Sequence, residues 1–122
     1  MDVRRGLAGR GHQIFTLYVV IMVLVFLLPV PRSPLTESSQ LDKLVHFGIF
    51  LGFSLLFYFD RRLKLWWILL ISFAFAAAIE LVQSVLPYRE GDGWDFVAGA
   101  AGASVGAVLV LIITRQVDRT AR

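Results

Sequence analysis

Side chains that can move protons, hold metals or bind anions are concentrated between residues 42 and 95 of this chain. A carboxylate and an imidazole stand four positions apart at Asp42 and His46, and a carboxylate and an amide stand three apart at Glu80 and Gln83. On helices, each pair would line one face. Carboxylates and imidazoles are the groups that proteins use for acid–base catalysis and as metal ligands. This stretch is therefore the candidate functional site.

Two cationic side chains, Lys43 and Arg89, lie in the same stretch, together with the further carboxylates of Asp92 and Asp95. Arginine offers a planar fork and lysine a point charge, so the two cations suit a phosphate group. Asp92 lies between two glycines and is interpreted as a loop charge. We expect the ligand-binding residues to be Asp42, Lys43, His46, Glu80, Gln83, Arg89 and Asp95.

The remainder of the chain is strongly apolar. Its 122 residues are 57% hydrophobic, with a mean hydropathy of +0.73, which is typical of an integral membrane protein. Four apolar runs predict an all-α, four-helix membrane bundle that forms one domain over residues 1–122. The predicted spans are about 14–30, 41–59, 65–86 and 96–113. The chain has no cysteine, which excludes disulfides, thiolate zinc sites and cysteine nucleophiles.

Positive charge is distributed unevenly about these spans and predicts their orientation. Nine Lys and Arg residues fall on one side of the predicted membrane and three on the other. The larger group is Arg4, Arg5, Arg10, Arg61, Arg62, Lys64, Arg115, Arg119 and Arg122, and the smaller is Arg32, Lys43 and Arg89. Both termini should therefore be cytoplasmic, which places the polar site in the extracytoplasmic leaflet. Nucleic-acid binding is not expected, because the aromatic residues lie within the apolar runs.

Helical rise predicts how deep each polar residue lies. Counted at ~1.5 Å per residue from the two ends of the connecting turn, His46 lies ~21 Å from Asp60 and Glu80 ~24 Å from Lys64. Asp42, Gln83 and Asp95 come out a few ångströms nearer the outer surface by the same count. An ionised Glu80 facing lipid would be costly, so the facing helices should pair it with a polar partner. We expect a deeper layer of His46 and Glu80 beneath a shallower polar layer.

Structural interpretations remain open beside the functional ones. Asp42 and Asp95 each precede a predicted span and could act as helix N-caps. Gln83 could join two helices by a hydrogen bond, and Lys43 and Arg89 could reach toward lipid headgroups. None of these residues identifies a ligand by itself.

Small residues recur every four positions in the last predicted span, at Ala98, Gly102 and Gly106. A stripe of this kind lets another helix approach closely. The Gly102/Gly106 face is thus a candidate contact for a homo-oligomer.

The polar residues together form a recognisable pattern. Asp42-Lys43-Leu44-Val45-His46 carries the motif D-K-x-x-H, Glu80–Gln83 carries E-x-x-Q, and Pro87, Arg89 and Asp95 follow. Over roughly residues 41 to 112, the chain resembles the VanZ-like family of small bacterial membrane proteins. That family commonly has Asn four residues after the last Asp, where this chain has Gly99. The resemblance implies a cell-envelope role and a link to resistance against the glycopeptide teicoplanin.

Three functions fit these observations. The preferred one is binding of an anionic or lipid-linked envelope precursor, or of a glycopeptide, at the outer leaflet. The second is a membrane enzyme that uses His46 and Glu80 as an acid–base pair, or a metal held by these two with Asp42 and Asp95. The third is a proton-coupled or structural membrane subunit. No motif provides a nucleophile, and no spacing by itself assigns a metal or cofactor.

Overall fold

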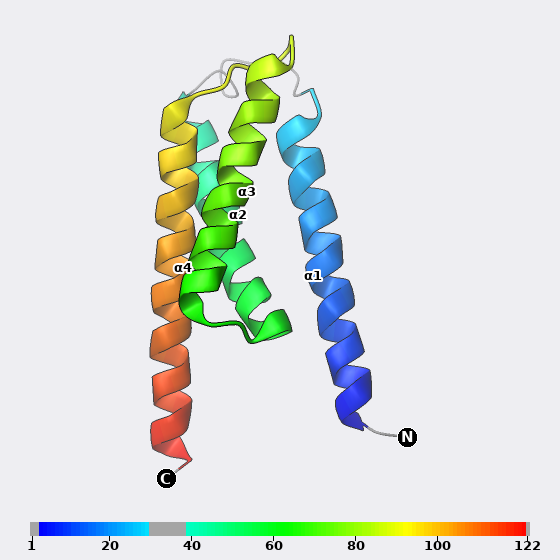
Figure 1. The fold of residues 1–122 in the computed structure, drawn as a ribbon, viewed down its shortest axis with the longest axis vertical. Helices are drawn as coiled ribbons and strands as arrows, with labels where there is room; N and C mark the ends of the chain where they lie inside the picture. Colours follow the sequence, from blue (N-terminus) through cyan, green and yellow to red (C-terminus); the bar gives the residue numbers. More distant parts are fainter. Residues whose placement is uncertain (1–2, 30–38, 122) are drawn as a thin grey trace.

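The structure, a computed structural model, describes residues 3–29 and 39–121, and it is entirely helical apart from short connections. The helices run in alternating directions (Figure 1). We call the end where α1 and α3 finish the loop end, and the opposite end, which carries both chain termini, the terminal end. All four helices are long and apolar enough to cross a membrane. They are α1 (Val3–Leu27), α2 (Ser39–Arg61), α3 (Leu65–Val85) and α4 (Gly93–Thr120).

The helices differ from the predicted spans mainly at their ends. Helix α1 ends at Leu27, shortly before Pro29, and residue 30 of the predicted span lies outside the described residues. Helix α4 extends beyond the predicted 96–113 at both ends. Its start is fixed by Asp92, whose side chain accepts the backbone N–H of Trp94. Hydropathy marks the part of a helix suited to lipid, and the helix itself continues into polar sequence.

Helix α4 packs along α2 more extensively than any other pair of helices pack together. A side-chain carbon at Gly102 would collide with the carbonyl of Phe47, and one at Gly106 would lie 2.7 Å from the carbonyl oxygen of Leu51. The small-residue stripe therefore serves contact within one chain. Helix α2 thus lies against the Gly102/Gly106 face, and contact of this face with a second copy stays a prediction.

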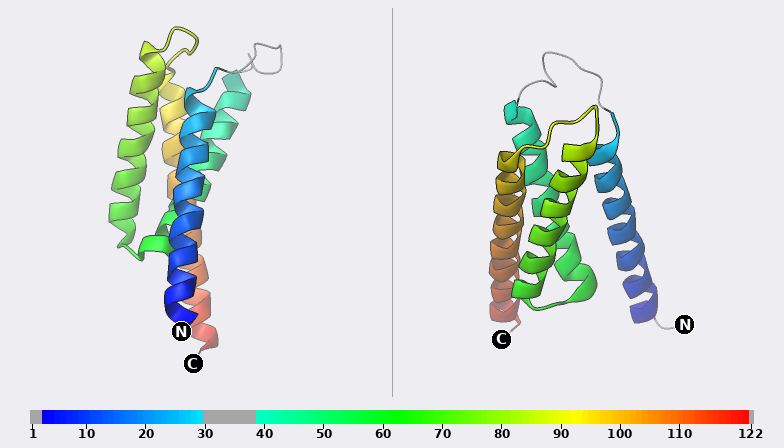
Figure 2. Two further views of the ribbon diagram at one scale, coloured as in Figure 1. Left: turned by 90° about the vertical axis from the view of Figure 1, so that its right-hand side faces the viewer. Right: turned by 45° about the horizontal axis from the view of Figure 1, so that its top comes forward.

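Helix α3 packs on both α2 and α4, while α1 lies against α2 and α3 (Figure 2). The arrangement brings the end of α1, the start of α2, the end of α3 and the start of α4 to the loop end. The predicted site residues are carried by these same segments and by the connection from α3 to α4.

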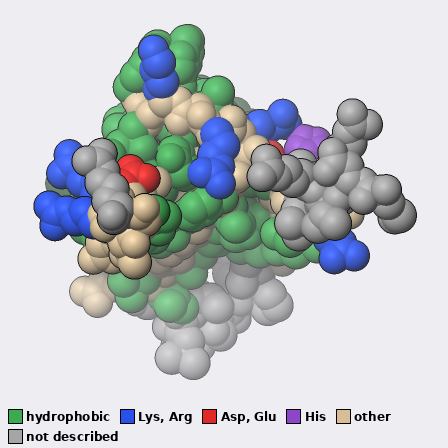
Figure 3. All heavy atoms as spheres, turned by 90° about the horizontal axis from the view of Figure 1, so that it is seen from below, with side chains coloured by type: hydrophobic (Ala, Val, Ile, Leu, Met, Phe, Trp, Pro, Cys, Tyr) green, Lys and Arg blue, Asp and Glu red, His purple; other side chains and the backbone are tan. Residues whose placement is uncertain are grey.

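The terminal end carries solvent-exposed positive charge. Lys and Arg side chains are scattered over it among hydrophobic and neutral atoms (Figure 3). The exposed residues described there are Arg10, Arg61, Arg62, Lys64, Arg115 and Arg119. Four further arginines of the charge count have side chains that the structure does not describe: Arg4, Arg5, Arg32 and Arg122.

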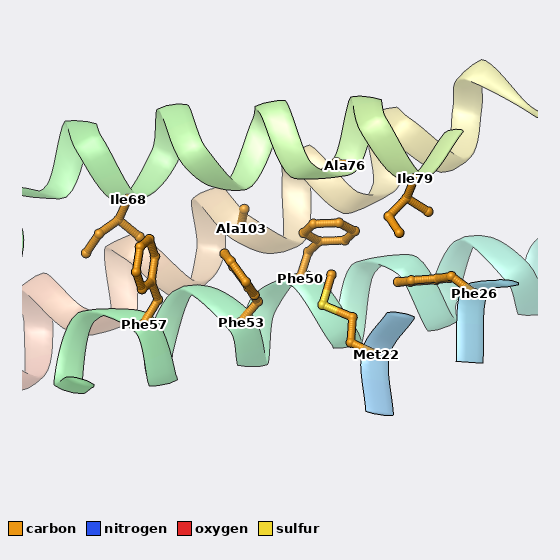
Figure 4. Close-up of a cluster of buried hydrophobic side chains, with 9 residues drawn as sticks. All are labelled: Met22, Phe26, Phe50, Phe53, Phe57, Ile68, Ala76, Ile79 and Ala103. Atoms are coloured by element: carbon orange, nitrogen blue, oxygen red, sulfur yellow. The ribbon is translucent and has the colours of Figure 1, made fainter. Parts of the chain in front are cut away.

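The interior between the two ends is built from aromatic and aliphatic side chains of all four helices (Figure 4). Phe50 and Phe53 of α2 pack at its centre, and the ring of Phe53 stacks on Phe75 of α3 at 5.5 Å. The outer faces are also apolar: Leu81 and Val85 are 70% and 77% exposed. Surfaces of this kind match lipid.

Candidate functional site

His46 and Glu80 meet at the loop end, as their predicted depths require. The Nε2 atom of His46 lies 3.1 Å from Oε1 of Glu80, and the side chains are 1% and 12% exposed. The other ring nitrogen, Nδ1, lies 3.0 Å from the backbone oxygen of Asp42, one turn earlier on α2. A neutral imidazole that donates from Nδ1 to this carbonyl presents an unprotonated Nε2. The ring is also held flat against Phe26, at a centroid distance of 4.4 Å.

The close approach of His46 and Glu80 is not an aligned hydrogen bond. Among the described residues, neither Nε2 of His46 nor Oε1 of Glu80 has a hydrogen-bond partner, although both are buried. The second oxygen of Glu80, Oε2, accepts the backbone N–H of Asp92 at 3.1 Å. Glu80 is thus fixed on one side and leaves a buried acceptor pointing at the imidazole.

Asp92 has a larger role than the predicted loop charge, and that interpretation was wrong. It is the N-cap of α4, and its other carboxylate oxygen accepts from Lys43 Nζ at 2.8 Å. The hydrogen bond from Lys43, followed by that from the Trp94 N–H, holds the pKa of Asp92 below its ordinary value. The sequence signal of an aspartate directly before an apolar run points to Asp95 and not to Asp92, because the helix begins one turn before its apolar part.

Asp95 does not cap α4; it lies in the first turn with its side chain 4% exposed. Its Oδ1 atom is 3.5 Å from Lys43 Nζ and makes no hydrogen bond among the described residues. Asp42 lies within the first turn of α2, which begins at Ser39, so it is not the N-cap either. Ligand atoms of Asp42, His46 and Asp95 all lie within 4.8 Å of one another. The two carboxylates therefore flank the imidazole.

Gln83 and Arg89 do not join the other expected binding residues, and Gln83 joins two helices as its structural interpretation predicts. The amide of Gln83 donates to the backbone oxygen of Phe26 at 2.9 Å. One terminal nitrogen of Arg89 donates to the backbone oxygens of Val25 and Leu28 at 2.9 and 3.0 Å. The last carbonyls of a helix have no partner within it, so these side chains complete the end of α1.

Tyr88 was not predicted to take part, yet its hydroxyl donates to the backbone oxygen of Leu27 at 2.9 Å. Together with Gln83 and Arg89, Tyr88 donates hydrogen bonds to the carbonyls at the end of α1 and holds that end in place. Capping by distant side chains leaves no pattern in the sequence of α1 itself. No spacing rule could therefore have identified the role of Tyr88.

The remaining six residues are called the polar cluster: Asp42, Lys43, His46, Glu80, Asp92 and Asp95. Four are carboxylic acids, one is an ammonium and one an imidazole. Ser84, the nearest hydroxyl in sequence to Gln83, is exposed and donates to the backbone oxygen of Leu81, so it supplies no nucleophile here. The polar cluster therefore has several side chains that can bind a cation, and its one ammonium group, Lys43, is paired with carboxylates.

A family model described as VanZ/LLP1 matches residues 14–114. The chain belongs to the VanZ-like family. No curated protein and no solved structure gives a significant match. Family membership and four apolar helices make the chain a VanZ-like, multi-pass membrane protein of the cell envelope.

The departure from the family pattern at Gly99 has a structural counterpart. A side-chain carbon at Gly99 would lie 2.9 Å from Cδ2 of Phe50. Any larger residue there requires that ring to move, because 2.9 Å is shorter than a carbon–carbon contact. In this VanZ-like chain, Phe50 occupies the space beside α4 that an asparagine side chain would need.

Proposed function

We propose that this VanZ-like protein binds an envelope component at the extracytoplasmic leaflet through its polar cluster. The observation that supports it most is the convergence of ionisable side chains from α2, α3 and the start of α4 in an otherwise apolar bundle. Ionisable groups within membrane spans are costly, and for that reason they mark functional sites by default.

The orientation rests on charge. Exposed lysines and arginines cover the terminal end, and cytoplasmic segments are the ones that carry such an excess. This excess supports a cytoplasmic location of both termini. The loop end, with the polar cluster, then faces the outer leaflet.

Lys43 is the cation through which the cluster would meet a phosphate of a lipid-linked precursor. It is 30% exposed, whereas Arg89 is engaged with carbonyl groups of α1. Its contacts with Asp92 and Asp95 orient the ammonium but also compete with an incoming anion. An acidic cluster of this kind would bind a diphosphate better than an uncharged lipid only with Lys43 in place.

The test is binding of a polyprenyl diphosphate to the purified protein in lipid nanodiscs, followed by native mass spectrometry. We expect saturable binding that Lys43→Ala weakens at least about tenfold, because a charge-assisted hydrogen bond is lost. Lys64→Ala, at the terminal end, is the matched control and should bind as the wild type does. Absence of binding, or equal loss in both variants, would refute the proposal.

The link to glycopeptides is tested separately, in cells. Expression of the wild type in a sensitive host should raise tolerance to teicoplanin, and Glu80→Gln should abolish the gain while the protein still inserts. An unchanged tolerance with wild-type protein in the membrane would remove the resistance role and leave the binding role to the nanodisc experiment.

A second candidate function is acid–base catalysis by His46 and Glu80, favoured by their 3.1 Å separation. An imidazole and a carboxyl at this distance can pass a proton between them and a substrate. Turnover of a lipid-linked diphosphate by wild type but not by His46→Gln would establish it; binding without turnover would exclude it for that substrate.

A further inference from the structure

We propose that the polar cluster is a site for a divalent metal ion, with Asp42, His46 and Asp95 as ligands and Glu80 beside them. The three ligands come from two helices that pack closely along their length, α2 and α4. Asp42 and His46 are one helical turn apart, which is the spacing that lets two side chains of one helix reach a common ion.

The distances suit one ion. Ligand atoms of Asp42, His46 and Asp95 all lie within 4.8 Å of one another. Two ligands that share a zinc ion at ~2.1 Å each stand roughly 3.0–3.4 Å apart. The ligand atoms of Asp42, His46 and Asp95 would have to move closer to reach this spacing, with Glu80 beside them at 3.1 Å from His46 Nε2.

Unpartnered buried atoms provide an independent indication of a ligand. His46 and Asp95 are 1% and 3% exposed, yet Nε2 of the first and Oδ1 of the second lack hydrogen-bond partners among the described residues. Oε1 of Glu80 shares this condition. Buried polar atoms are nearly always satisfied, whereas here His46 and Glu80 only face one another at 3.1 Å without alignment and Asp95 lies 3.5 Å from Lys43. A cation accepts all three, because each is an electron-pair donor.

His46 and Glu80 make further contacts that would hold their side chains in position for a metal ion. Nδ1 of His46 lies 3.0 Å from the backbone oxygen of Asp42, which fixes the ring and directs Nε2 inward. Glu80 is anchored through its other oxygen by the Asp92 N–H. Groups that are held in this way lose little freedom on binding an ion.

Charge favours a divalent ion. The four carboxyl groups of the polar cluster outnumber its single ammonium group, Lys43, and a divalent cation would balance them. Lys43 lies 3.5 Å from Asp95 but 2.8 Å from the more exposed Asp92, so it can remain with Asp92 when an ion takes the place beside Asp95. One imidazole with carboxylates suits Zn²⁺, and carboxylates alone would suit Mn²⁺ or Mg²⁺. Zn²⁺ is the ion we propose.

A metal at this position would also attract phosphate to an acidic cluster, and that consequence rests on the proposed function. The proposal of metal binding does not depend on the proposed function. Metal binding is measured without any lipid ligand, so failure of one proposal leaves the other standing.

The experiment uses the full chain, purified through a tag without histidine, freed of metal with a chelator and then titrated with Zn²⁺ by calorimetry. We expect one ion per chain in the wild type, confirmed by elemental analysis. Asp95→Asn and His46→Gln should each weaken Zn²⁺ binding at least about tenfold. Glu90→Gln removes an exposed acid of the same loop and is the matched control, expected to bind as the wild type does.

A thermal melt completes the test, because a buried substitution could prevent folding. Zn²⁺ should raise the Tm of the wild type and of Glu90→Gln but not that of Asp95→Asn. If Asp95→Asn does not fold, the half-buried Asp42→Asn is used in its place. Wild-type protein that takes up no stoichiometric Zn²⁺, or folded ligand variants that bind it undiminished, would overturn the metal site.

Discussion

Each end of the bundle carries a histidine beside a largely buried carboxylate, and the two pairs differ in the exposure of the histidine and in the charges next to the carboxylate. At the terminal end, His12 lies 3.4 Å from Asp60, and its side chain is 55% exposed. Arg61 also contacts Asp60, at 3.1 Å, so this carboxylate has a permanent cation beside it. At the loop end, His46 and Glu80 are buried together and leave atoms without partners.

The comparison indicates which charged residues mark a candidate functional site. An exposed histidine is satisfied by water, and a carboxylate next to arginine has a cation beside it, so this pair requires no ligand. The buried pair at the loop end lacks these means of satisfaction. Residue type alone does not distinguish the two pairs. The burial of the histidine and the charges next to the carboxylate distinguish them.

The largest contrast is expected from removing each histidine. His46→Ala empties a fully buried site against Phe26 and leaves Glu80 without its neighbour, so unfolding should become easier by about 3 kcal/mol. His12→Ala should cost less than about 0.5 kcal/mol, because the imidazole is exposed and Arg61 remains beside Asp60. Reversible unfolding in mixed detergent micelles measures both. Equal losses in the two variants would remove the distinction between the ends.

A smaller effect is expected where side chains fasten α1. Arg89→Ala removes two hydrogen bonds to carbonyls of α1, at a cost of about 1–3 kcal/mol. Arg62→Ala, at the terminal end, removes an exposed arginine near the rings of Tyr58 and Phe59 and should cost less than about 1 kcal/mol. Spin labels on α1 and α3 should report wider distances only in Arg89→Ala; unchanged distances would contradict the fastening role.

The helix arrangement was largely predictable from sequence, and the contacts of individual residues were not. Apolar runs identified all four helices, and helical rise placed His46 and Glu80 at one level. The stripe at Gly102 indicated that a helix comes close but could not say which one. Arg89 and Asp92 lie in or beside a connection, where no periodicity fixes the direction of a side chain.

Acid should affect the loop end through Asp92. Its folded pKa lies below the ordinary value, so its contribution to stability is present above about pH 4 and is lost as pH falls through the lowered pKa. Asp92→Asn should therefore be less stable than the wild type at neutral pH, with the gap closing below about pH 4. Unfolding across pH measures it. A gap that widens in acid would have the wrong sign.

The smallest effect is expected at Ser84, which is exposed on α3 one residue after Gln83. Ser84→Ala loses only a hydrogen bond to the carbonyl of Leu81 and should change stability by less than about 0.5 kcal/mol. Binding of polyprenyl diphosphate should be unchanged in nanodiscs. A loss of binding would show that the site extends over a face of α3 that the polar cluster does not include.

The difference between the two ends of the bundle bears on the proposed function only if the two ends face opposite sides of the membrane. The chain contains no cysteine, so single-cysteine variants report position without background. Glu90→Cys at the loop end and Lys64→Cys at the terminal end, both exposed positions, are treated with a membrane-impermeant maleimide in right-side-out vesicles. We expect Glu90→Cys to be labelled and Lys64→Cys to be labelled only after permeabilisation. The opposite pattern would place the polar cluster in the cytoplasmic leaflet and contradict the proposed envelope site.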